Sequence, residues 1–417
     1  MKYKKSGFIV ITFMALSVVL FKSYESYAID AKIMFNKRLR SAVKTKISNS
    51  LITNKKFTDE VSFEDITYKL DYTIDDKLQL ALIKLLKRYP SEHTSVVVVD
   101  NETGGILAAA GVKKKNREID FTLPFSSTHP SASLFKLVTS ADLIENGGLF
   151  TDKMYTYRGK GTTLYKYQLK DKKSRWSRSM SFKRAFIFSN NVIFGKAAMR
   201  ETDPSSIFKM ALKFGFNRNL MDDFNLGVSR FDMPDSQYNL AELATGFNGE
   251  TQVSPVHAAI FSLIIANDGV MMKPHILKSI ISEEDELFSS VKTIKVFSKK
   301  TAKDLRLMMK ATTERGTARR LTRGRMGRKI ANFFELGAKT GSITGGLPYG
   351  KRDWITLYAK PKVSGGRGIS ISVMNINKKK WYYKSTFIAK NILNVIRKLY
   401  EIELSESAVD NKKMISL

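Results

Sequence analysis

Apolar residues are spaced differently in the middle of the chain than on either side. An apolar, β-branched run at residues 95–100 is followed by a turn sequence at 101–105 and by a returning apolar run at 106–111. Runs of this kind around a glycine-containing turn are typical of a β-hairpin. Strand signals return near the other end of the chain, at 334–340, 354–359 and 369–374. The pattern therefore predicts strands at both ends of one main region.

Between these strands, apolar residues recur at three- and four-residue steps, which is the spacing of amphipathic helices. The stretches with this spacing are 134–144, 182–199, 207–213, 255–265 and 301–313. Ser254 and Pro255 form a typical helix start, and Asn146-Gly147-Gly148 forms a typical stop. Further helices are expected at 76–87 and 387–399.

This order of elements predicts an α+β fold. We expect one mainly antiparallel sheet assembled from both chain ends, flanked by helices, with an inserted all-α lobe packed beside it. The main domain should cover 76–402, after a short polar stalk or linker at 29–75 and before a loose tail at 403–417. A functional site is expected in the cleft between the lobes.

The N-terminus is organised like an export signal. Lys2, Lys4 and Lys5 precede an apolar run at 8–21, and Ser26-Tyr27-Ala28 has the small residues of a cleavage site. The run is shorter than the ~20 residues that a spanning helix needs. Residues 1–28 are therefore either a cleaved signal peptide or an uncleaved membrane anchor. Both predict export, with the protein on the inner membrane facing the periplasm or cell exterior, or secreted.

Composition limits the chemistry. The chain has no cysteine, which excludes disulfides and thiolate metal sites. Its four histidines, at 93, 129, 257 and 275, are scattered along the sequence, so they suggest neither a metal cluster nor a Ser-His pair. We expect no cofactor and no metal.

The net charge is +31, from 70 lysines and arginines against 39 acidic residues. Such an excess favours anionic partners. No zinc-finger spacing, RNA-binding strand motif or P-loop is present, and the export signal argues against a nucleic-acid partner.

The candidate chemistry begins with Ser133 and Lys136 at the start of the first mid-chain helix. Residues three apart lie on one helix face, and a hydroxyl in the first turn lies near the positive end of the helix dipole. A desolvated, neutral amine can accept the proton of such a hydroxyl. The spacing alone is not specific, because it recurs at Ser41, Ser206 and Ser289.

Two further short motifs follow in order. Ser189-Asn190-Asn191 comes after an apolar stretch, and Lys339-Thr340-Gly341-Ser342 lies on a predicted edge strand. Each motif is weak alone, but the three together, separated by room for a helical lobe, form a specific pattern.

In this order the motifs resemble those of the transpeptidase domain of penicillin-binding proteins. The resemblance covers roughly residues 76–400 and extends to the segments 253–259, 315–318 and 353–359. Three places depart from the family pattern. Ala132 stands where larger members usually have glycine, Ser342 stands where threonine is commoner, and Phe247-Asn248-Gly249-Glu250 replaces the usual glutamine-glycine turn.

The resemblance implies a serine D,D-transpeptidase that cross-links peptidoglycan through an acyl-serine intermediate and binds penicillin covalently. Its substrates would be stem peptides ending in D-Ala-D-Ala. Ser133 would be the nucleophile, Lys136 the base and Ser189 a proton relay to the leaving amine. Asn191 would bind an amide of the substrate.

The third motif would bind the end of the substrate. Lys339 would lower the pKa of the neighbouring amine and attract the terminal carboxylate, which Thr340 and Ser342 would hydrogen-bond. Gly341 would let the substrate lie along the strand. The backbone N–H groups of Ser133 and Ser342 would form the oxyanion hole.

The resemblance also implies partners: peptidoglycan stem peptides, β-lactams, the inner membrane through the N-terminal segment, and other cell-wall synthesis proteins. Three alternatives stay open from the sequence. These are a D,D-carboxypeptidase, which uses water as acceptor, a serine β-lactamase or β-lactam sensor, and a cell-wall scaffold module without activity.

Overall fold

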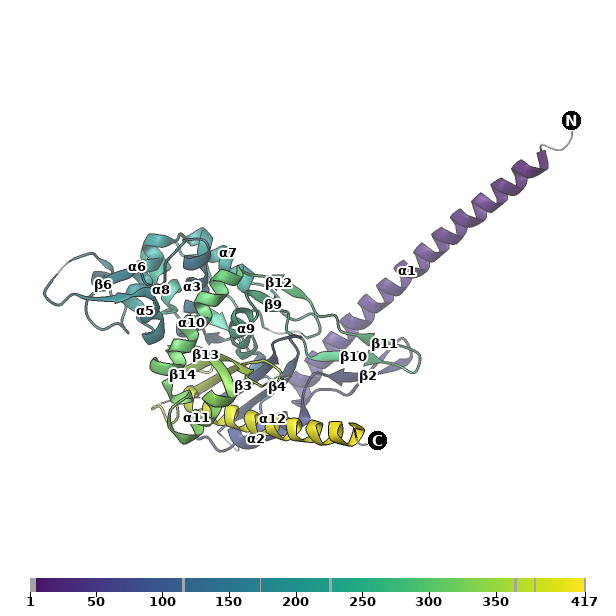
Figure 1. The fold of residues 1–417 in the computed structure, drawn as a ribbon. Coiled ribbons are helices and arrows are strands. Elements are labelled where there is room, and N and C mark those ends of the chain that lie inside the picture. Colours follow the sequence, from purple (N-terminus) through teal and green to yellow (C-terminus); the bar gives the residue numbers. More distant parts are fainter. Residues whose placement is uncertain are drawn as a thin grey trace.

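The computed structural model describes residues 5–114, 117–172, 174–224, 227–363, 366–378 and 380–415, with backbone only for 5–28 and 403–415. A sheet-containing body, a mainly helical lobe beside it and a long N-terminal helix make up the molecule (Figure 1). The predicted fold class is confirmed.

The central sheet has five antiparallel strands in the order β13-β14-β15-β3-β4. Their bounds are β13 Phe334–Gly345, β14 Gly350–Pro361, β15 Ile369–Asn377, β3 His93–Asp100 and β4 Ile106–Lys113. Strand β15 pairs with β3, with Ile371 opposite Val98, so a late segment joins an early one. The sheet is thus built from both chain ends, and β13 is an edge strand as predicted.

Strand β3 is buried along almost its whole length and is apolar from Val96 to Val99, because helices cover both faces of the sheet. Val96 and Val98 pack into one core with α2 (Asp76–Leu86) and α12 (Ser385–Ile415). Val97 and Val99 point the other way, into the core that contains α9 (Pro255–Ala266). Alternate side chains of a strand face opposite sides, so a strand covered on both sides needs apolar residues throughout.

The lobe contains α3 Lys136–Glu145, α4 Lys166–Leu169, α5 Phe182–Phe188, α6 Asn191–Glu201, α7 Pro204–Phe214, α8 Gln237–Thr245 and α10 Lys299–Arg315. Short ribbons that the apolar pattern did not predict accompany them: β5 His129–Pro130 with β8 Gln252–Val253, and β6 Met154–Tyr157 with β7 Arg178–Ser181. The lobe is therefore mainly helical.

The single helix predicted over 182–199 is wrong, because the structure breaks it at the second motif. Ser189 ends α5 with a φ of 56°, and the side chain of Asn190 caps α6 by accepting from the N–H of Ile193. Asparagine is among the favoured N-cap residues. The motif itself is therefore the helix boundary, while the apolar spacing runs through it.

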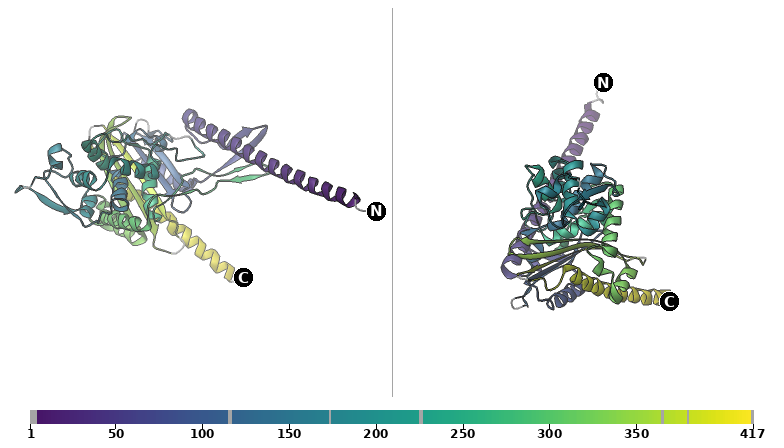
Figure 2. Two further views of the ribbon diagram at one scale, coloured as in Figure 1. Left: turned by 90° about the horizontal axis from the view of Figure 1, so that it is seen from above. Right: turned by 90° about the vertical axis from the view of Figure 1, so that its left-hand side faces the viewer.

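The N-terminal helix, α1 (Lys5–Asn54), projects from the body in both views of Figure 2. Its last turns are held by the buried residues Leu39, Val43, Ile47 and Leu51. The chain then forms β1 Glu60–Phe63 and β2 Ile66–Tyr72, which join β10 Leu277–Ile281 and β11 Glu286–Phe288 in a four-stranded sheet. Strands β9 Val270–Met272 and β12 Thr293–Lys295, which come before and after β10 and β11 in the sequence, pair in a separate two-stranded ribbon.

The described residues include no helix that combines the length and apolar character needed to cross a membrane. The apolar run expected to direct export, residues 8–21, lies outside the part of the chain whose side chains are described. At the other end, α12 continues to Ile415, through the segment expected to be a loose tail.

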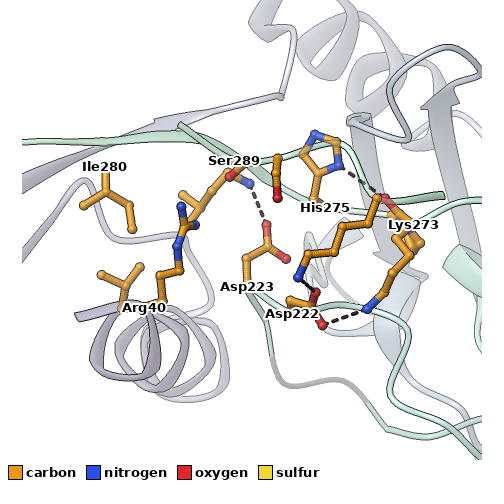
Figure 3. A pocket seen from close by; sticks show the side chains of 12 residues that line it. Arg40, Asp222, Asp223, Lys273, His275, Ile280 and Ser289 are labelled. Atoms are coloured by element: carbon orange, nitrogen blue, oxygen red, sulfur yellow. Dashed lines mark hydrogen bonds and ion pairs between the residues drawn. The ribbon is translucent and has the colours of Figure 1, made fainter. Parts of the chain in front are cut away.

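A charged cavity of about 130 Å³ marks the place where α1 meets the body (Figure 3). Asp222 accepts hydrogen bonds from Lys273 and Lys292, each at 2.8 Å. Asp223 accepts from two backbone N–H groups of the 276–277 segment. No residue of the three motifs lines this cavity, whose walls include Arg40 and Val43 of α1.

One contact between the lobe and the segment that carries Ser133 depends on a glycine. Helix α8 ends at Gly246, which has a φ of +65°, and a Cβ at this position would lie 1.8 Å from the carbonyl oxygen of Ala132. Side chains are disfavoured at positive φ, and backbone atoms cannot move aside cheaply. Gly246 therefore lets α8 pack directly on the segment that carries Ser133.

We expect Gly246→Ala to lower the free energy of unfolding by ~2 kcal/mol or more, because it combines backbone strain with a steric clash. Denaturant unfolding measures this effect. Gly249→Ala is the matched control, since a Cβ there meets nothing within 4 Å; it should change stability by less than ~0.5 kcal/mol. Equal effects of the two substitutions would contradict the packing role of Gly246.

Candidate active site

Ser133 lies in a short 3₁₀ turn, Ala132–Leu134, which leads into α3. The sequence predicts Ser133 in the first turn of the α-helix itself; the structure places it just before. Ala132 begins the turn with a φ of +49°, a conformation that a residue with a Cβ adopts at a cost. This is the position at which larger family members usually have glycine.

Lys136 is fully buried and its amine meets three oxygen atoms. The Nζ atom lies 2.7 Å from Ser133 Oγ, 2.6 Å from Asn191 Oδ1 and 2.9 Å from the carbonyl oxygen of Thr245. A neutral amine would donate its two N–H groups to the amide and carbonyl oxygens. Its lone pair would then face the serine hydroxyl, as a proton acceptor requires.

The electrostatic surroundings favour that neutral form. Burial lowers the pKa of Lys136 well below its ordinary value, and the nearby cation of Lys339 lowers it further. Burial also lowers the pKa of Lys339, to about 7. Removing an ammonium ion from water destabilises the charged form, so both lysines lose protons more readily than lysines in solution.

The second motif is joined to the third by a direct contact. Lys339 Nζ donates to Ser189 Oγ at 2.9 Å and to the carbonyl oxygen of Thr340 at 2.8 Å. The left-handed backbone at Ser189 ends α5 at this point. The hydroxyl of Ser189 is therefore held beside the amine of the edge strand.

Strand β13 also lies against the Ala132–Leu134 turn. A Cβ at Gly341 would lie 3.1 Å from Cβ of Ala132 and 3.2 Å from the backbone nitrogen of Ser133. Alternation along the strand puts Lys339 and Gly341 on one face and Thr340 and Ser342 on the other. Glycine thus allows close approach of the strand to the turn.

The hydroxyls of Thr340 and Ser342 have partners within the protein. Thr340 Oγ1 donates to Thr317 Oγ1 at 2.6 Å, and Ser342 Oγ donates to Asp353 Oδ1 at 2.7 Å. The structure thus brings Ser133, Lys136, Ser189, Asn191, Lys339 and Gly341 into one site. For Thr340 and Ser342, a hydrogen bond to a substrate carboxylate would require the hydroxyl hydrogen to turn from its present acceptor.

Sequence reasoning missed the groups that orient Asn191. Its side-chain N–H donates to the carbonyl oxygen of Thr162 at 3.0 Å, and its backbone N–H donates to the carbonyl oxygen of Gly161 at 2.6 Å. These bonds turn the Oδ1 atom toward Lys136. The contacts use main-chain carbonyls, which every residue type provides, so no residue pattern signals them.

Across the described ranges, His, Asp and Glu residues nowhere gather in threes that could hold a metal ion. His129 lies four positions before Ser133 in the sequence and is buried beside Arg352. Burial and that guanidinium lower its pKa to about 3. It is therefore neutral near pH 7 and hydrogen-bonded to Arg352 rather than to Ser133.

The turn at Gly161 offers a test of how Asn191 is oriented. A Cβ at Gly161 would lie 2.5 Å from Asn190 Nδ2, so Gly161→Ala should displace the turn and rotate the Asn191 amide. We expect labelling by a fluorescent penicillin to slow at least tenfold. Asn190→Gly removes the obstructing side chain and should lower the free energy of unfolding by only ~0.3 kcal/mol.

The double variant Gly161→Ala/Asn190→Gly should therefore recover most of the labelling rate, and Asn190→Gly alone should stay close to the unmodified protein. If the double variant labels as slowly as Gly161→Ala, the clash is not the cause and the proposed orientation of Asn191 by this turn is wrong.

Comparison with known proteins agrees with the site. The sequence model of the penicillin binding protein transpeptidase domain matches residues 94–396. Penicillin-binding protein 3 of Bacillus subtilis is 26% identical over 283 residues, covering 60% of this chain and 40% of the relative. PbpB of Mycolicibacterium smegmatis is 24% identical over 316 residues, covering 68% and 47%. The chain thus spans less than half the length of these curated relatives.

Solved structures show the same fold. Apo penicillin-binding protein 3 from Mycobacterium tuberculosis superimposes with a TM-score of 0.65 at 19% identity, covering 82% of each chain. The D,D-transpeptidase domain of a peptidoglycan glycosyltransferase from Eggerthella lenta gives 0.62 at 22% identity, covering 81% of this chain and 84% of that one. The family match spans most of the chain and contains all three motifs, so this protein belongs to the penicillin-binding protein transpeptidase family.

Proposed function

We propose that this chain is a serine D,D-transpeptidase that acts on stem peptides ending in D-Ala-D-Ala and cross-links peptidoglycan. The observation that carries the proposal is the 2.7 Å contact between a fully buried lysine amine and Ser133 Oγ. A hydroxyl next to a desolvated amine is an activated nucleophile.

In the first step, Lys136 takes the proton of Ser133 and Oγ attacks the carbonyl carbon between the two D-alanines. The negative charge that develops on the carbonyl oxygen would be bound by the backbone N–H groups of Ser133 and Ser342. Oxyanion donors of this kind contribute ~3–4 kcal/mol each in other acyl-transfer enzymes. The strand and the turn that would supply them lie in contact at Gly341.

In the second step, the C–N bond breaks and the leaving amine of the terminal D-alanine needs a proton. Ser189 Oγ would deliver it and take a replacement proton from the Lys339 ammonium, which donates a hydrogen bond to this hydroxyl at 2.9 Å. The acyl group remains on Ser133 as an ester, and Lys136 holds the proton that Ser133 lost. An amine of a second stem peptide then attacks this ester and gives its proton back to Lys339 through Ser189, while Lys136 returns its proton to Ser133 Oγ as the ester C–O bond breaks.

Water in place of that amine would give a D,D-carboxypeptidase, and fast hydrolysis of a penicilloyl ester would give a β-lactamase. Penicillin-binding protein 3 from M. tuberculosis has been crystallised with aztreonam and with ampicillin. We propose that β-lactams acylate Ser133 of this chain as substrate analogues.

The proposal includes a location. Residues 1–28 would act as a signal peptide or membrane anchor, so that the domain faces the periplasm or the cell exterior, where peptidoglycan lies. Further proteins of cell-wall synthesis would be partners there. Cell fractionation tests the location: recovery of the full-length chain in the cytosol would oppose it.

A fluorescent penicillin should label the protein covalently, and Ser133→Ala should abolish the label. Lys136→Ala should slow labelling by ~10²–10⁴-fold, the usual contribution of a general base. Gel fluorescence measures both. Labelling that survives in Ser133→Ala would place the nucleophile elsewhere and end the proposal.

The acceptor can be determined from the products. Incubation with muropeptides that carry pentapeptide stems should yield cross-linked dimers, measured by chromatography and mass spectrometry. Release of D-alanine without dimers would instead identify a carboxypeptidase. Loss of the penicillin label within minutes would favour the β-lactamase.

Penicillin acylation should depend on pH through the two buried lysines. The second-order rate should rise as Lys136 loses its proton and fall as Lys339, with a pKa of about 7, loses its charge. The profile of this rate constant reports the pKa values of the free enzyme. We expect a bell whose alkaline limb lies near neutral pH.

Lys339→Arg identifies the group behind the alkaline limb, because a guanidinium stays protonated over the accessible range. For the molecules of this variant that penicillin still labels, the alkaline limb of the rate profile should move to higher pH. An unchanged limb would show that another group titrates there.

A further inference from the structure

The ribbon β6–β7 and the segment between its strands form an arm at the edge of the helical lobe (Figure 1). From Tyr157 to Arg178 the sequence has eight lysines and arginines and a single acidic residue, Asp171. The acyl-transfer mechanism uses none of these side chains. The arm is thus a strongly basic element with a role still to assign.

The arm also exposes aromatic rings. Tyr165 and Tyr167 are 56% and 53% exposed, and Trp176 is 71% exposed. The two tyrosine rings are stacked, with centroids 5.8 Å apart and planes within 12°. Exposed aromatic rings gathered on one element are typical of an interaction surface rather than of a solvated one.

Cations lie over these rings. The guanidinium of Arg158 lies 6.0 Å from the ring centre of Tyr167, and that of Arg175 lies 4.8 Å from Trp176. The guanidinium of Arg178 also donates a hydrogen bond to the carbonyl oxygen of Gly159, which ties the two sides of the arm together. Exposed rings thus have cations beside them on both sides of the arm.

The single acidic residue of the arm does not neutralise this surface. Asp171 forms salt bridges with Lys196 and Arg200, both on α6, and so fastens the arm to the lobe. Within the part of the arm that the structure describes, none of the other cations forms a salt bridge with a described carboxylate. Their positive charge is available to an anionic ligand.

The inner side of the same segment belongs to the candidate active site. Gly161 and Thr162 hold Asn191 through their carbonyl oxygens, and Asn191 in turn contacts the amine of Lys136. Tyr165 and Tyr167 follow within five residues along the chain. A polymer bound to the arm would therefore lie next to the residues of the candidate active site.

We propose that residues 158–167, together with Trp176, bind the anionic glycan strand whose stem peptide enters the active site. This proposal rests on the proposed function. Flat aromatic faces suit the apolar faces of sugar rings, and the cations suit the carboxylates of neighbouring stem peptides. Single-stranded nucleic acid uses similar groups, but the hydrogen bonds that join the arm to Asn191 of the candidate active site favour the glycan.

The test compares the full-length chain with Tyr165→Ala/Tyr167→Ala. We expect co-sedimentation with purified peptidoglycan sacculi to fall at least fivefold, while the rate of fluorescent penicillin labelling stays within twofold. The proposed acylation mechanism uses neither tyrosine side chain, so unchanged labelling also shows that the variant is folded.

Tyr382→Ala is the matched control, since Tyr382 is 41% exposed and also has lysine ammonium groups over its ring, but lies outside the arm. It should bind sacculi as the unmodified chain does. Equal loss in both variants, or no loss in the arm variant, overturns the proposal. So does competition by a single-stranded oligonucleotide that equals that of soluble glycan fragments.

The same experiment separates the two proposals. If penicillin does not label the unmodified chain, but binding of the chain to sacculi still depends on Tyr165 and Tyr167, the proposed enzymatic function fails and the glycan surface stands. If labelling depends on Ser133 but sacculus binding ignores the tyrosines, the glycan surface fails and the enzymatic function stands.

Discussion

The structure depends on the burial of two lysine amines beside one another. Lys136 and Lys339 are both fully buried, and among the described residues neither forms a salt bridge with a carboxylate. An uncompensated buried charge is costly, so the protein lowers the cost by keeping the amines partly neutral and by surrounding them with oxygen atoms. Aromatic rings also lie beside the amines: the ring centre of Phe194 is 5.4 Å from Lys136 Nζ, and the ring centre of Phe186 is 5.7 Å from Lys339 Nζ.

Each element around the site holds one of these groups in place. The end of α8 supplies the carbonyl oxygen of Thr245, the start of α6 supplies Asn191, and the end of α5 supplies Ser189. The sheet supplies Lys339 from an edge strand. Because helix ends and a strand edge carry fixed backbone groups, the amines meet acceptors that require no rearrangement when a substrate arrives.

Much of this arrangement follows from the sequence. The apolar runs predicted the hairpin of β3 and β4, and the spacing of Ser133 and Lys136 predicted their contact. Sequence could not predict the break at Ser189, because the apolar spacing of α5 continues into α6 without interruption. Nor could it identify Gly161, Thr162 or Thr245, which act through main-chain oxygens. The hydrogen bond from Ser342 to Asp353 depends on strand register, which only the assembled sheet defines.

The place of β15 between β14 and β3 has a consequence for folding. The partner of β3 is separated from it by most of the domain, with Val98 facing Ile371. A chain that emerges from the ribosome N-terminus first would carry the β3–β4 hairpin with the β15-facing edge of β3 unpaired until almost the whole domain had followed. Such high contact order slows folding, and an unpaired edge invites aggregation. Lys339 lies on β13 and also arrives late, so the candidate site would be completed only as the last strands join the sheet.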